Sequence, residues 1–285
     1  LSTVDAGFGP GMEGRMEPRP MKTLRVTREE AVLRVVLNRP DQRNAMNLQM
    51  FDELREVFEG VAGDRGVRVV SLSGAGGNFC SGGDLTPDDA PREDIPLRER
   101  TLGVLRDRVA PMAKALHAVP QPTLAVVEGK AAGAGANLAF GCDLVLAAGS
   151  ARFSQIFVRR ALSLDCGGSW LLPRRVGLHK AKELALFGDW IDASEALALG
   201  LVNRVVPTAE LGALARDWCE RLASRAPGAI AAIKRSLDES FELSFSEALE
   251  RETSAQVERT SSPEFAEAMA AFIERREPEF SGEES

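Results

Sequence analysis

Hydrophobic and polar positions begin to follow a regular pattern near residue 21. Two β-rich runs, residues 24–26 and 31–37, are separated by charged residues and predict an opening hairpin. Asn47 can then cap a helix through residue 59, because apolar side chains recur there at helical spacing. Residues 67–72 form a short apolar run, typical of a buried strand, which leads into the glycine-rich residues 73–78. Strand and helix therefore alternate from the start of this pattern.

The same alternation continues through the middle of the chain. Residues 97–118 are compatible with a helix, and residues 123–127 and 144–148 predict buried strands. Small residues at positions 129–136 fill the turn after the first of these strands. Because alternating strands and helices favour a parallel sheet with helical crossovers, we predict an α/β fold.

Helical periodicity dominates after Ala181 and predicts a helical C-terminal region. Its apolar face, with Phe241, Phe245 and Phe272, must pack on the core or on a neighbouring subunit. Residues 1–20 contain repeated Gly and Pro with little periodicity, and predict a flexible extension. We therefore divide the chain into this extension, a core over residues 21–225 and a helical oligomerisation region over residues 226–285.

Charge and cysteine spacing narrow the range of partners. The 35 basic and 42 acidic residues give a formal net charge of -7, which argues against a nucleic-acid backbone as the main partner. The 4 cysteines form no CxxC pair, so neither a disulfide framework nor a zinc site is indicated, and a reducing cytoplasm is the expected location. The chain contains no apolar run of about 18 residues and no secretory signal pattern, so we expect no membrane partner.

Two glycine-rich turns, residues 73–78 and 129–136, follow predicted strands and can present unpaired backbone N–H groups. Such groups at the start of a helix carry partial positive charge and suit an oxyanion or a phosphate. Taken singly, a glycine-rich turn more often serves only to bend the backbone. Neither turn has the GxxxxGK[ST] spacing of a nucleotide-binding P-loop, which disfavours NTP hydrolysis.

Read together, four segments carry a resemblance to a known family. They are NRPDQRNAMN at residues 38–47, NFCSGGDL at residues 78–85, VEGKAAGAGAN at residues 127–137 and DCGGSW at residues 165–170. In this order they resemble the crotonase, or enoyl-CoA hydratase/isomerase, superfamily. With ALGLVN at residues 198–203 and FIERREPEF at residues 272–280, the resemblance covers about residues 22–282.

The resemblance implies a crotonase-like spiral of ββα units followed by a C-terminal helical subdomain, assembled as a homotrimer or a dimer of trimers. It also implies an acyl-CoA substrate, with coenzyme A as part of that substrate and no metal or separate cofactor. Two backbone amides, those of Gly83 and Ala134, would form an oxyanion hole. The second position is commonly glycine in the family, but alanine supplies the same N–H group.

An oxyanion hole favours the enolate that forms when a proton leaves or joins the carbon beside a thioester carbonyl. Hydratases similar to this chain use two glutamates, and the matching positions here are Asn137 and Phe157. Neither side chain transfers a proton at neutral pH, so the usual activation of water by two carboxylates is absent. Asp165 occupies the place where enoyl-CoA isomerases, dienoyl-CoA isomerases and a dehalogenase carry an active aspartate. Its surroundings look most like the phenylacetate-pathway isomerase subgroup.

One carboxylate is enough for a 1,3-proton shift, because it removes a proton on one side of the enolate and returns it on the other. An apolar setting near Trp170, Leu171 and Phe157 would raise the pKa of the Asp165 carboxyl by desolvation. The alternative interpretation is that Asp165 merely caps a helix that starts at Cys166. Capping and catalysis are compatible roles.

Further candidates for substrate binding come from the same motifs. Arg43 lies in a loop that borders the CoA entrance in the family, and is either a phosphate ligand or a solvated surface charge. His117 and His179 lie far from any serine or cysteine motif, and Cys80 and Cys166 are more typical of buried apolar positions than of nucleophiles. The remaining candidates line the motifs themselves: Ser81, Gly82, Asp84, Leu85, Gly133, Asn137, Phe157 and Trp170.

Three functional hypotheses follow. The first is an enoyl-CoA isomerase in which Asp165 moves the proton. The second is an atypical enoyl-CoA hydratase that uses Asp165 and an ordered water. The third is a non-catalytic acyl-CoA-binding protein, since an inactive relative would also lack both hydratase carboxylates. The presence of Asp165 argues against the third hypothesis.

Overall fold

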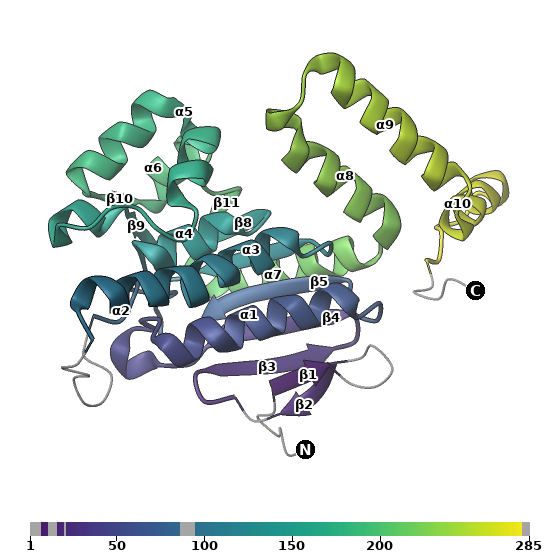
Figure 1. Cartoon of the computed structure of the whole chain (residues 1–285). Coiled ribbons are helices and arrows are strands. Elements are labelled where there is room, and N and C mark those ends of the chain that lie inside the picture. The colour runs from purple at the N-terminus through teal and green to yellow at the C-terminus, as the bar shows by residue number, and fades with distance from the viewer. Residues whose placement is uncertain (1–6, 11–15, 20, 86–94, 281–285) are drawn as a thin grey trace.

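The computed structural model describes residues 7–10, 16–19, 21–85 and 95–280. Its centre is a six-stranded sheet in the order β11-β8-β6-β5-β4-β3 (Figure 1). β3 and β4 are antiparallel, and the other neighbours are parallel. The strands are β3 Leu24–Glu29, β4 Val32–Leu37, β5 Val69–Gly74, β6 Thr123–Val127, β8 Leu144–Ala148 and β11 Arg204–Val206. The predicted α/β class with a largely parallel sheet is confirmed.

A second sheet of three short strands lies beside the first. β7, Lys130–Ala132, is parallel to β9, Arg152–Ser154, which is antiparallel to β10, Trp190–Asp192. β7 follows β6 after a break at Gly129, whose φ is +58° and whose added Cβ would lie 2.2 Å from the Gly77 carbonyl oxygen. Only glycine fits this close approach, so the chain can leave the main sheet here and begin the second one.

Helices cover both faces of the main sheet, so its strands are apolar on both sides. Figure 1 shows α1, Leu48–Gly63, and α3, Ala110–Ala118, on one face, and α7, Thr208–Ala223, on the other. Leu33, Val35 and Leu37 of β4 belong to the core cluster under α1, while Val32 packs in the cluster under α7. Alternate residues of one strand thus fill two cores.

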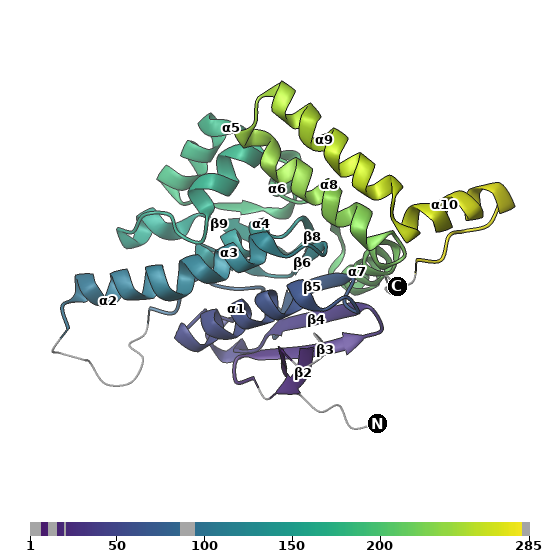
Figure 2. The same cartoon turned by 45° about the vertical axis from the view of Figure 1, so that its right-hand side comes forward.

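The remaining helices are α2 Leu97–Val104, α4 Ala134–Gly141, α5 Gly168–Phe187, α6 Ala193–Ala198, α8 Pro227–Glu239, α9 Phe245–Thr260 and α10 Pro263–Glu274. Figure 2 shows α8, α9 and α10 as an arm that leaves the sheet and its covering helices. The helical C-terminal subdomain is therefore confirmed. On this arm Phe245, Phe272 and Ile273 are 79%, 78% and 75% exposed, which leaves much of its apolar face uncovered.

Two local features differ from the sequence pattern. The pattern predicts no strand before residue 21, whereas β1, Gly7–Pro10, pairs antiparallel with β2, Met16–Arg19. The rest of the predicted extension lies outside the described residues, and the three-part domain division stays a prediction. The helix predicted over residues 97–118 is interrupted by a π-helical turn, Leu105–Val109. Pro111 follows this turn, and a proline ring cannot fit a regular preceding helical turn.

No helix in the described ranges is long and apolar enough to cross a membrane.

Candidate active site

Three of the segments that carry the family resemblance meet at the edge of the sheet. Cys80 pairs with Ala131 of β7, and its N–H donates to the Lys130 carbonyl at 3.0 Å. Met46 pairs with Gly83, and its N–H donates to the Gly82 carbonyl at 2.8 Å. Residues 80–83 therefore run between the other two segments and are held by backbone hydrogen bonds on both sides.

Residues 78–85 and the predicted glycine-rich turn at residues 129–136 approach each other closely, and their glycines are required by geometry. Gly82 has φ +109°, and a Cβ there would lie 3.0 Å from the Ala132 carbonyl oxygen and 4.0 Å from the Ala134 nitrogen. Gly133 has φ +52°, and its own Cβ would lie 3.6 Å from the Phe157 ring. L-residues rarely adopt these φ values. The two segments therefore pack closely, and the Phe157 ring lies next to Gly133.

The backbone amides of Gly83 and Ala134 have no hydrogen-bond acceptor among the residues that the structure describes. Ala134 is the first residue of α4, so its N–H has no partner within the helix. Neither this N–H nor that of Gly83 donates to another residue in the described ranges. The start of α4 also carries the positive end of the helix dipole. This geometry suits the predicted oxyanion hole.

Asp165 lies in the turn that leads into α5. The helix begins only at Gly168, its N-cap is Gly167, and no side chain caps it. The interpretation of Asp165 as a cap for a helix starting at Cys166 is therefore wrong. Cys166 has φ +47°, an unfavourable left-handed conformation for a residue with a Cβ, and Gly167 follows with φ +78°. These two residues bend the chain sharply directly after Asp165.

The Asp165 carboxyl is poorly solvated. Its Oδ1 is buried and has no hydrogen-bond partner in the described part of the chain. Burial raises the pKa of this carboxyl from 3.8 to about 6. Both neighbouring thiols stay neutral at physiological pH, because burial raises the pKa of Cys80 to about 12 and that of Cys166 well above 9.0. The expected rise in the pKa of Asp165 thus has the predicted cause, desolvation.

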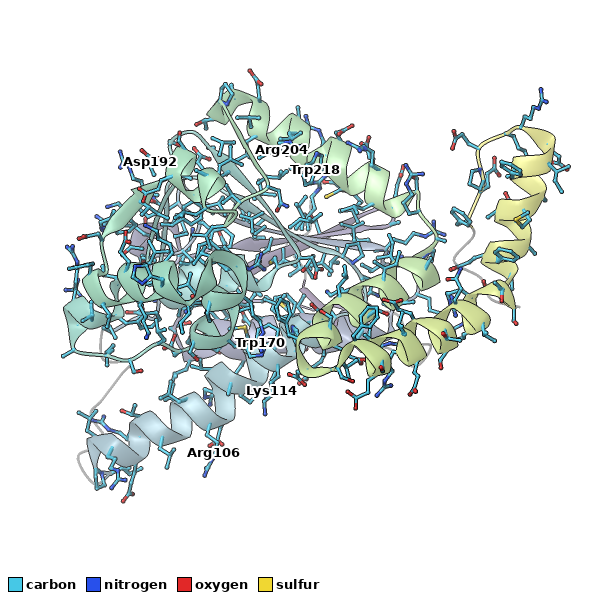
Figure 3. The ribbon with its side chains drawn as sticks, turned by 90° about the horizontal axis from the view of Figure 1, so that it is seen from above. Arg106, Lys114, Trp170, Asp192, Arg204 and Trp218 are labelled. Atoms are coloured by element: carbon cyan, nitrogen blue, oxygen red, sulfur yellow. The ribbon has the colours of Figure 1, made fainter. Side chains whose placement is uncertain are left out.

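A cavity of about 450 Å³ opens beside this turn, and Cys166 and Gly167 are part of its wall. Its other walls are mostly apolar: Met112, Leu116, Leu138, Trp170 and Leu171. Trp170 packs edge-on against His117 of α3, with ring centroids 5.3 Å apart. Figure 3 shows Trp170 where α5 passes close to α3. An apolar pocket with few polar groups suits an acyl chain.

Burial of the Asp165 carboxyl makes stability depend on pH. Its pKa is about 6 in the folded chain and 3.8 for an ordinary Asp, so the folded state binds the proton more tightly. The contribution of this group to stability is therefore fully present below pH 3.8 and is lost as pH rises through about 6. At about 1.4 kcal/mol per pKa unit, the cost at neutral pH is at most about 3 kcal/mol.

Asp165→Asn, which stays neutral, should therefore unfold at a higher urea concentration than the wild type at neutral pH. Below pH 3.8 the two proteins should unfold at nearly the same concentration. Urea titrations at both pH values measure this difference. Equal stability at neutral pH would contradict the desolvated carboxyl.

The other predicted substrate-binding residues are more dispersed. Arg43 is exposed, so its guanidinium charge is not buried. Its backbone carbonyl accepts a hydrogen bond from the Ser81 N–H at 3.0 Å, which places both residues at the border of the Gly83 loop. Leu85 is 67% exposed. Asp84 is not free, because its carboxylate pairs with Arg39 at 2.7 Å in a largely buried position. Asp84 therefore holds the Gly83 loop, a structural role.

Arg39 and Gln155 are two residues of the site that the sequence interpretation missed. Arg39 lies in the NRPDQRNAMN segment and also donates to the Ala45 carbonyl, so it ties that segment to the Gly83 loop. The signal in the sequence was a pair of opposite charges, Arg39 in residues 38–47 and Asp84 in residues 78–85, which could have indicated this ion pair. Gln155 donates to the Asn137 side chain at 2.9 Å, and no motif marks it.

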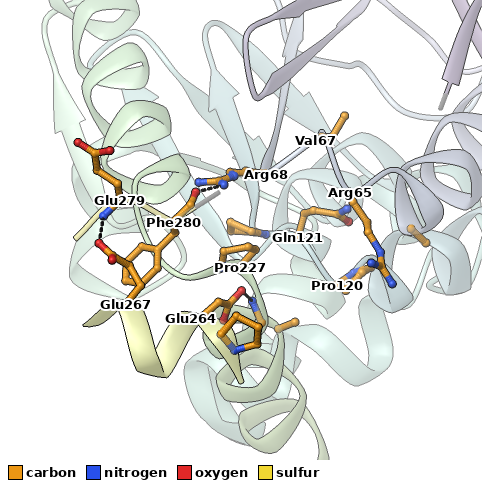
Figure 4. A pocket seen from close by; sticks show the side chains of 15 residues that line it. Arg65, Val67, Arg68, Pro120, Gln121, Pro227, Glu264, Glu267, Glu279 and Phe280 are labelled. Carbon is orange, nitrogen blue, oxygen red and sulfur yellow. Dashed lines mark hydrogen bonds between the residues drawn. The ribbon is translucent and has the colours of Figure 1, made fainter. Parts of the chain in front are cut away.

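A second hollow lies under the C-terminal segment (Figure 4). It measures about 260 Å³. Hydrogen bonds from its polar groups hold residues 279 and 280 against the rest of the chain. Arg68 donates to the Phe280 carbonyl, and the Glu279 N–H donates to Glu267 at 2.8 Å. Neither α4 nor the turn at Asp165 contributes to its wall, so this hollow is not the candidate active site.

Within the described ranges, no cluster of three or more His, Cys, Asp or Glu side chains could hold a metal ion. The expectation of a reaction without metal or separate cofactor stays a prediction.

Comparison with solved structures defines the class of protein. A crystal structure of the enoyl-CoA hydratase from Bacillus anthracis matches this fold with a TM-score of 0.85 and 30% sequence identity, over 92% of this chain and 100% of that chain. The fold is thus that of the crotonase enzymes.

Sequence comparison gives the family. The enoyl-CoA hydratase/isomerase family model matches residues 27–283, and the chain belongs to this family of acyl-CoA enzymes. It is 35% identical over 256 residues to the 1,2-epoxyphenylacetyl-CoA isomerase of Escherichia coli, covering 89% of this chain and 96% of that protein. It is 34% identical over 253 residues to the short-chain-enoyl-CoA hydratase of Clostridium acetobutylicum, covering 88% and 95% respectively. Hydratase names are more frequent than isomerase names among its relatives.

Proposed function

We propose that this protein is an enoyl-CoA isomerase that moves a double bond along the acyl chain with Asp165 as the only proton carrier. The observation that carries the proposal is the desolvated Asp165 carboxyl on a turn that Asn137 joins to α4, the helix that begins at Ala134. The Gly83 and Ala134 N–H groups, which donate to no other residue in the described ranges, supply the matching oxyanion donors. Asn137 and Phe157 occupy the positions where similar hydratases carry glutamates. Neither side chain can activate water.

The chemistry follows from these groups. The thioester oxygen accepts hydrogen bonds from the Gly83 and Ala134 N–H groups. The Asp165 carboxylate removes a proton from the α carbon of a β,γ-unsaturated acyl-CoA, and the electron pair moves onto the thioester oxygen as a dienolate. Asp165 then returns the proton to the γ carbon, which leaves the double bond between the α and β carbons. Charge and protons balance with no other reactant.

The raised pKa of Asp165 suits both halves of this shift. With a pKa of about 6, the carboxyl is mostly ionised at neutral pH, yet it is a stronger base than an ordinary aspartate. The expected kcat/KM therefore rises as pH increases through about 6. The name of the Escherichia coli relative, 1,2-epoxyphenylacetyl-CoA isomerase, supports an isomerisation.

The rival function is an enoyl-CoA hydratase in which Asp165 activates a water molecule, and the hydratase names among the relatives support it. Hydration requires a proton to be taken from water and another to be delivered to the α carbon. Hydratases divide this work between two carboxylates, whereas Asp165 would have to perform both steps.

The test is to incubate the purified protein separately with a β,γ-hexenoyl-CoA and with crotonyl-CoA. We expect rapid formation of the α,β-unsaturated isomer from the first substrate and slow hydration of the second. Fast hydration of crotonyl-CoA without any shift would contradict the proposal. Binding of both ligands without turnover would instead support the non-catalytic acyl-CoA-binding hypothesis.

We also propose that the protein assembles as a homotrimer or a dimer of trimers. The uncovered apolar side chains of the C-terminal arm, including Phe245, Phe272 and Ile273, support association. Light scattering on the purified protein measures the assembled mass, and a monomer would contradict this assembly.

A further inference from the structure

Asn137 links the two halves of the candidate site. It lies three residues after Ala134 on α4 and is only 1% exposed. Its Nδ2 donates a hydrogen bond to the Asp165 backbone carbonyl at 2.9 Å. The same helix therefore provides one oxyanion amide at its first residue and a direct hydrogen bond to the peptide of the proton carrier.

The Asn137 amide is itself held in place on two sides. Its Oδ1 accepts a hydrogen bond from Gln155 Nε2 at 2.9 Å, and Gln155 is also buried. On the other side, a Cβ added to Gly168 would lie 2.3 Å from Asn137 Nδ2. The orientation of the amide is thus fixed, with its donor group toward Asp165 and its acceptor toward Gln155.

The Asp165 backbone carbonyl accepts two hydrogen bonds in the described part of the chain, and one of them is local. The Asp165 carbonyl also accepts from the Gly168 N–H at 2.9 Å, but that bond closes the turn on itself. In the described part of the chain, Asn137 makes the long-range hydrogen bond of the Asp165 peptide, across 28 positions of sequence. Without it, the turn would lose its direct hydrogen bond to α4.

We propose that Asn137 is a positioning residue, which fixes the Asp165 main chain relative to the Ala134 amide and, being neutral, leaves the site with a single carboxylate. The inference rests on the proposed function. Asn137 touches the peptide of the proton carrier, so it acts through Asp165.

A carboxylate in place of the Asn137 amide would both weaken the hold on the Asp165 main chain and add a second charge to the site. It could not donate to the Asp165 carbonyl, and two acceptors would then face each other at hydrogen-bonding distance. Its negative charge would also disfavour ionisation of Asp165. A side chain at position 168 would collide with the amide, because a Cβ added to Gly168 would lie 2.3 Å from Asn137 Nδ2. The hydrogen bond to the Asp165 carbonyl and the absence of added charge therefore favour a neutral amide at position 137.

The charged and titratable groups around this pair are few. The Cys80 and Cys166 thiols are neutral, since burial raises the pKa of both. Lys114 and His117 of α3, and Glu242 after α8, line the adjoining cavity. The raised pKa of Asp165 comes from desolvation and not from a neighbouring charge. A carboxylate added nearby should therefore raise this pKa further.

The test compares Asn137→Asp and Asn137→Ala with the wild type. Both variants lose the hydrogen bond to Asp165, so kcat should fall on the order of 10²-fold with KM nearly unchanged. Only Asn137→Asp adds charge, so only it should also shift the kcat pH profile upward. A ¹³C titration of the Asp165 carboxyl should show the same upward shift of its pKa without any turnover, with Asp165→Asn used to assign the signal.

Asn203→Asp is the matched control, because within the described ranges the Asn203 side chain accepts a hydrogen bond from the Val145 N–H at 2.7 Å and donates none. Its kcat and pH profile should equal those of the wild type. Wild-type kcat in both Asn137 variants would overturn the inference, as would equal pH profiles for Asn137→Asp and Asn137→Ala. The carboxyl titration separates the two proposals, since a shift in a protein that isomerises nothing contradicts only the proposed function.

Discussion

Asp165→Asn should lower kcat for the double-bond shift by about 10²- to 10⁴-fold. An asparagine amide has the shape of the carboxyl group but cannot take a proton from the α carbon and return it to the γ carbon. Binding should survive, because in the proposed mechanism the Gly83 and Ala134 amides hold the thioester oxygen and the apolar walls of the cavity hold the acyl chain. Initial rates and calorimetric titration with a non-reactive acyl-CoA measure the two effects separately.

Asp238→Asn is the matched control for this variant. Burial also raises the pKa of Asp238, but this residue lies on α8 next to Lys234, in an adjoining hollow whose wall does not include Cys166 or Gly167. The same change of carboxyl to amide there should leave kcat essentially unaltered. Wild-type kcat in Asp165→Asn would contradict the assigned proton carrier.

Ala134→Pro should lower kcat/KM by about 10²- to 10³-fold, the loss observed when one donor of an oxyanion hole is removed. Ala134 is the first residue of α4, where proline is tolerated because the N–H has no helical partner. The substitution therefore removes the amide without breaking the helix. Ala134→Gly keeps the N–H and should lose far less activity.

Thr208→Pro controls for the insertion of proline itself. Thr208 is the first residue of α7 and is exposed, away from the candidate site. This variant should fold and turn over substrate like the wild type, as judged by circular dichroism and initial rates. Full activity in a folded Ala134→Pro protein would mean that the Ala134 amide does not bind the oxyanion.

The parts of the site that local sequence reveals are those set by backbone geometry. Gly82 and Gly133 stand out because positive φ values and close packing leave no room for a side chain. They follow apolar strands whose length and composition predict a buried parallel sheet. The pattern of strands and turns indicates where unpaired amides can lie, but the choice of Gly83 and Ala134 came from the family resemblance.

The parts that the sequence does not reveal depend on contacts between distant segments. Asn137 reaches Asp165 and Gln155 across the fold, and no periodicity marks such a hydrogen bond. The start of α5 was also misjudged, because Cys166 adopts a left-handed φ that a residue with a Cβ usually avoids. Strain at this turn is imposed by tertiary packing, which local propensity cannot show.

The most direct test follows the proton itself. A β,γ-unsaturated acyl-CoA with deuterium in both α positions is converted in ordinary water under single-turnover conditions, and the product is examined by mass spectrometry and NMR. If Asp165 alone carries the proton, part of the product should hold deuterium at the γ carbon, because return of the deuteron to the γ carbon competes with its loss to solvent. A product with only protium at the γ carbon, or a hydroxyacyl-CoA in its place, would contradict the account.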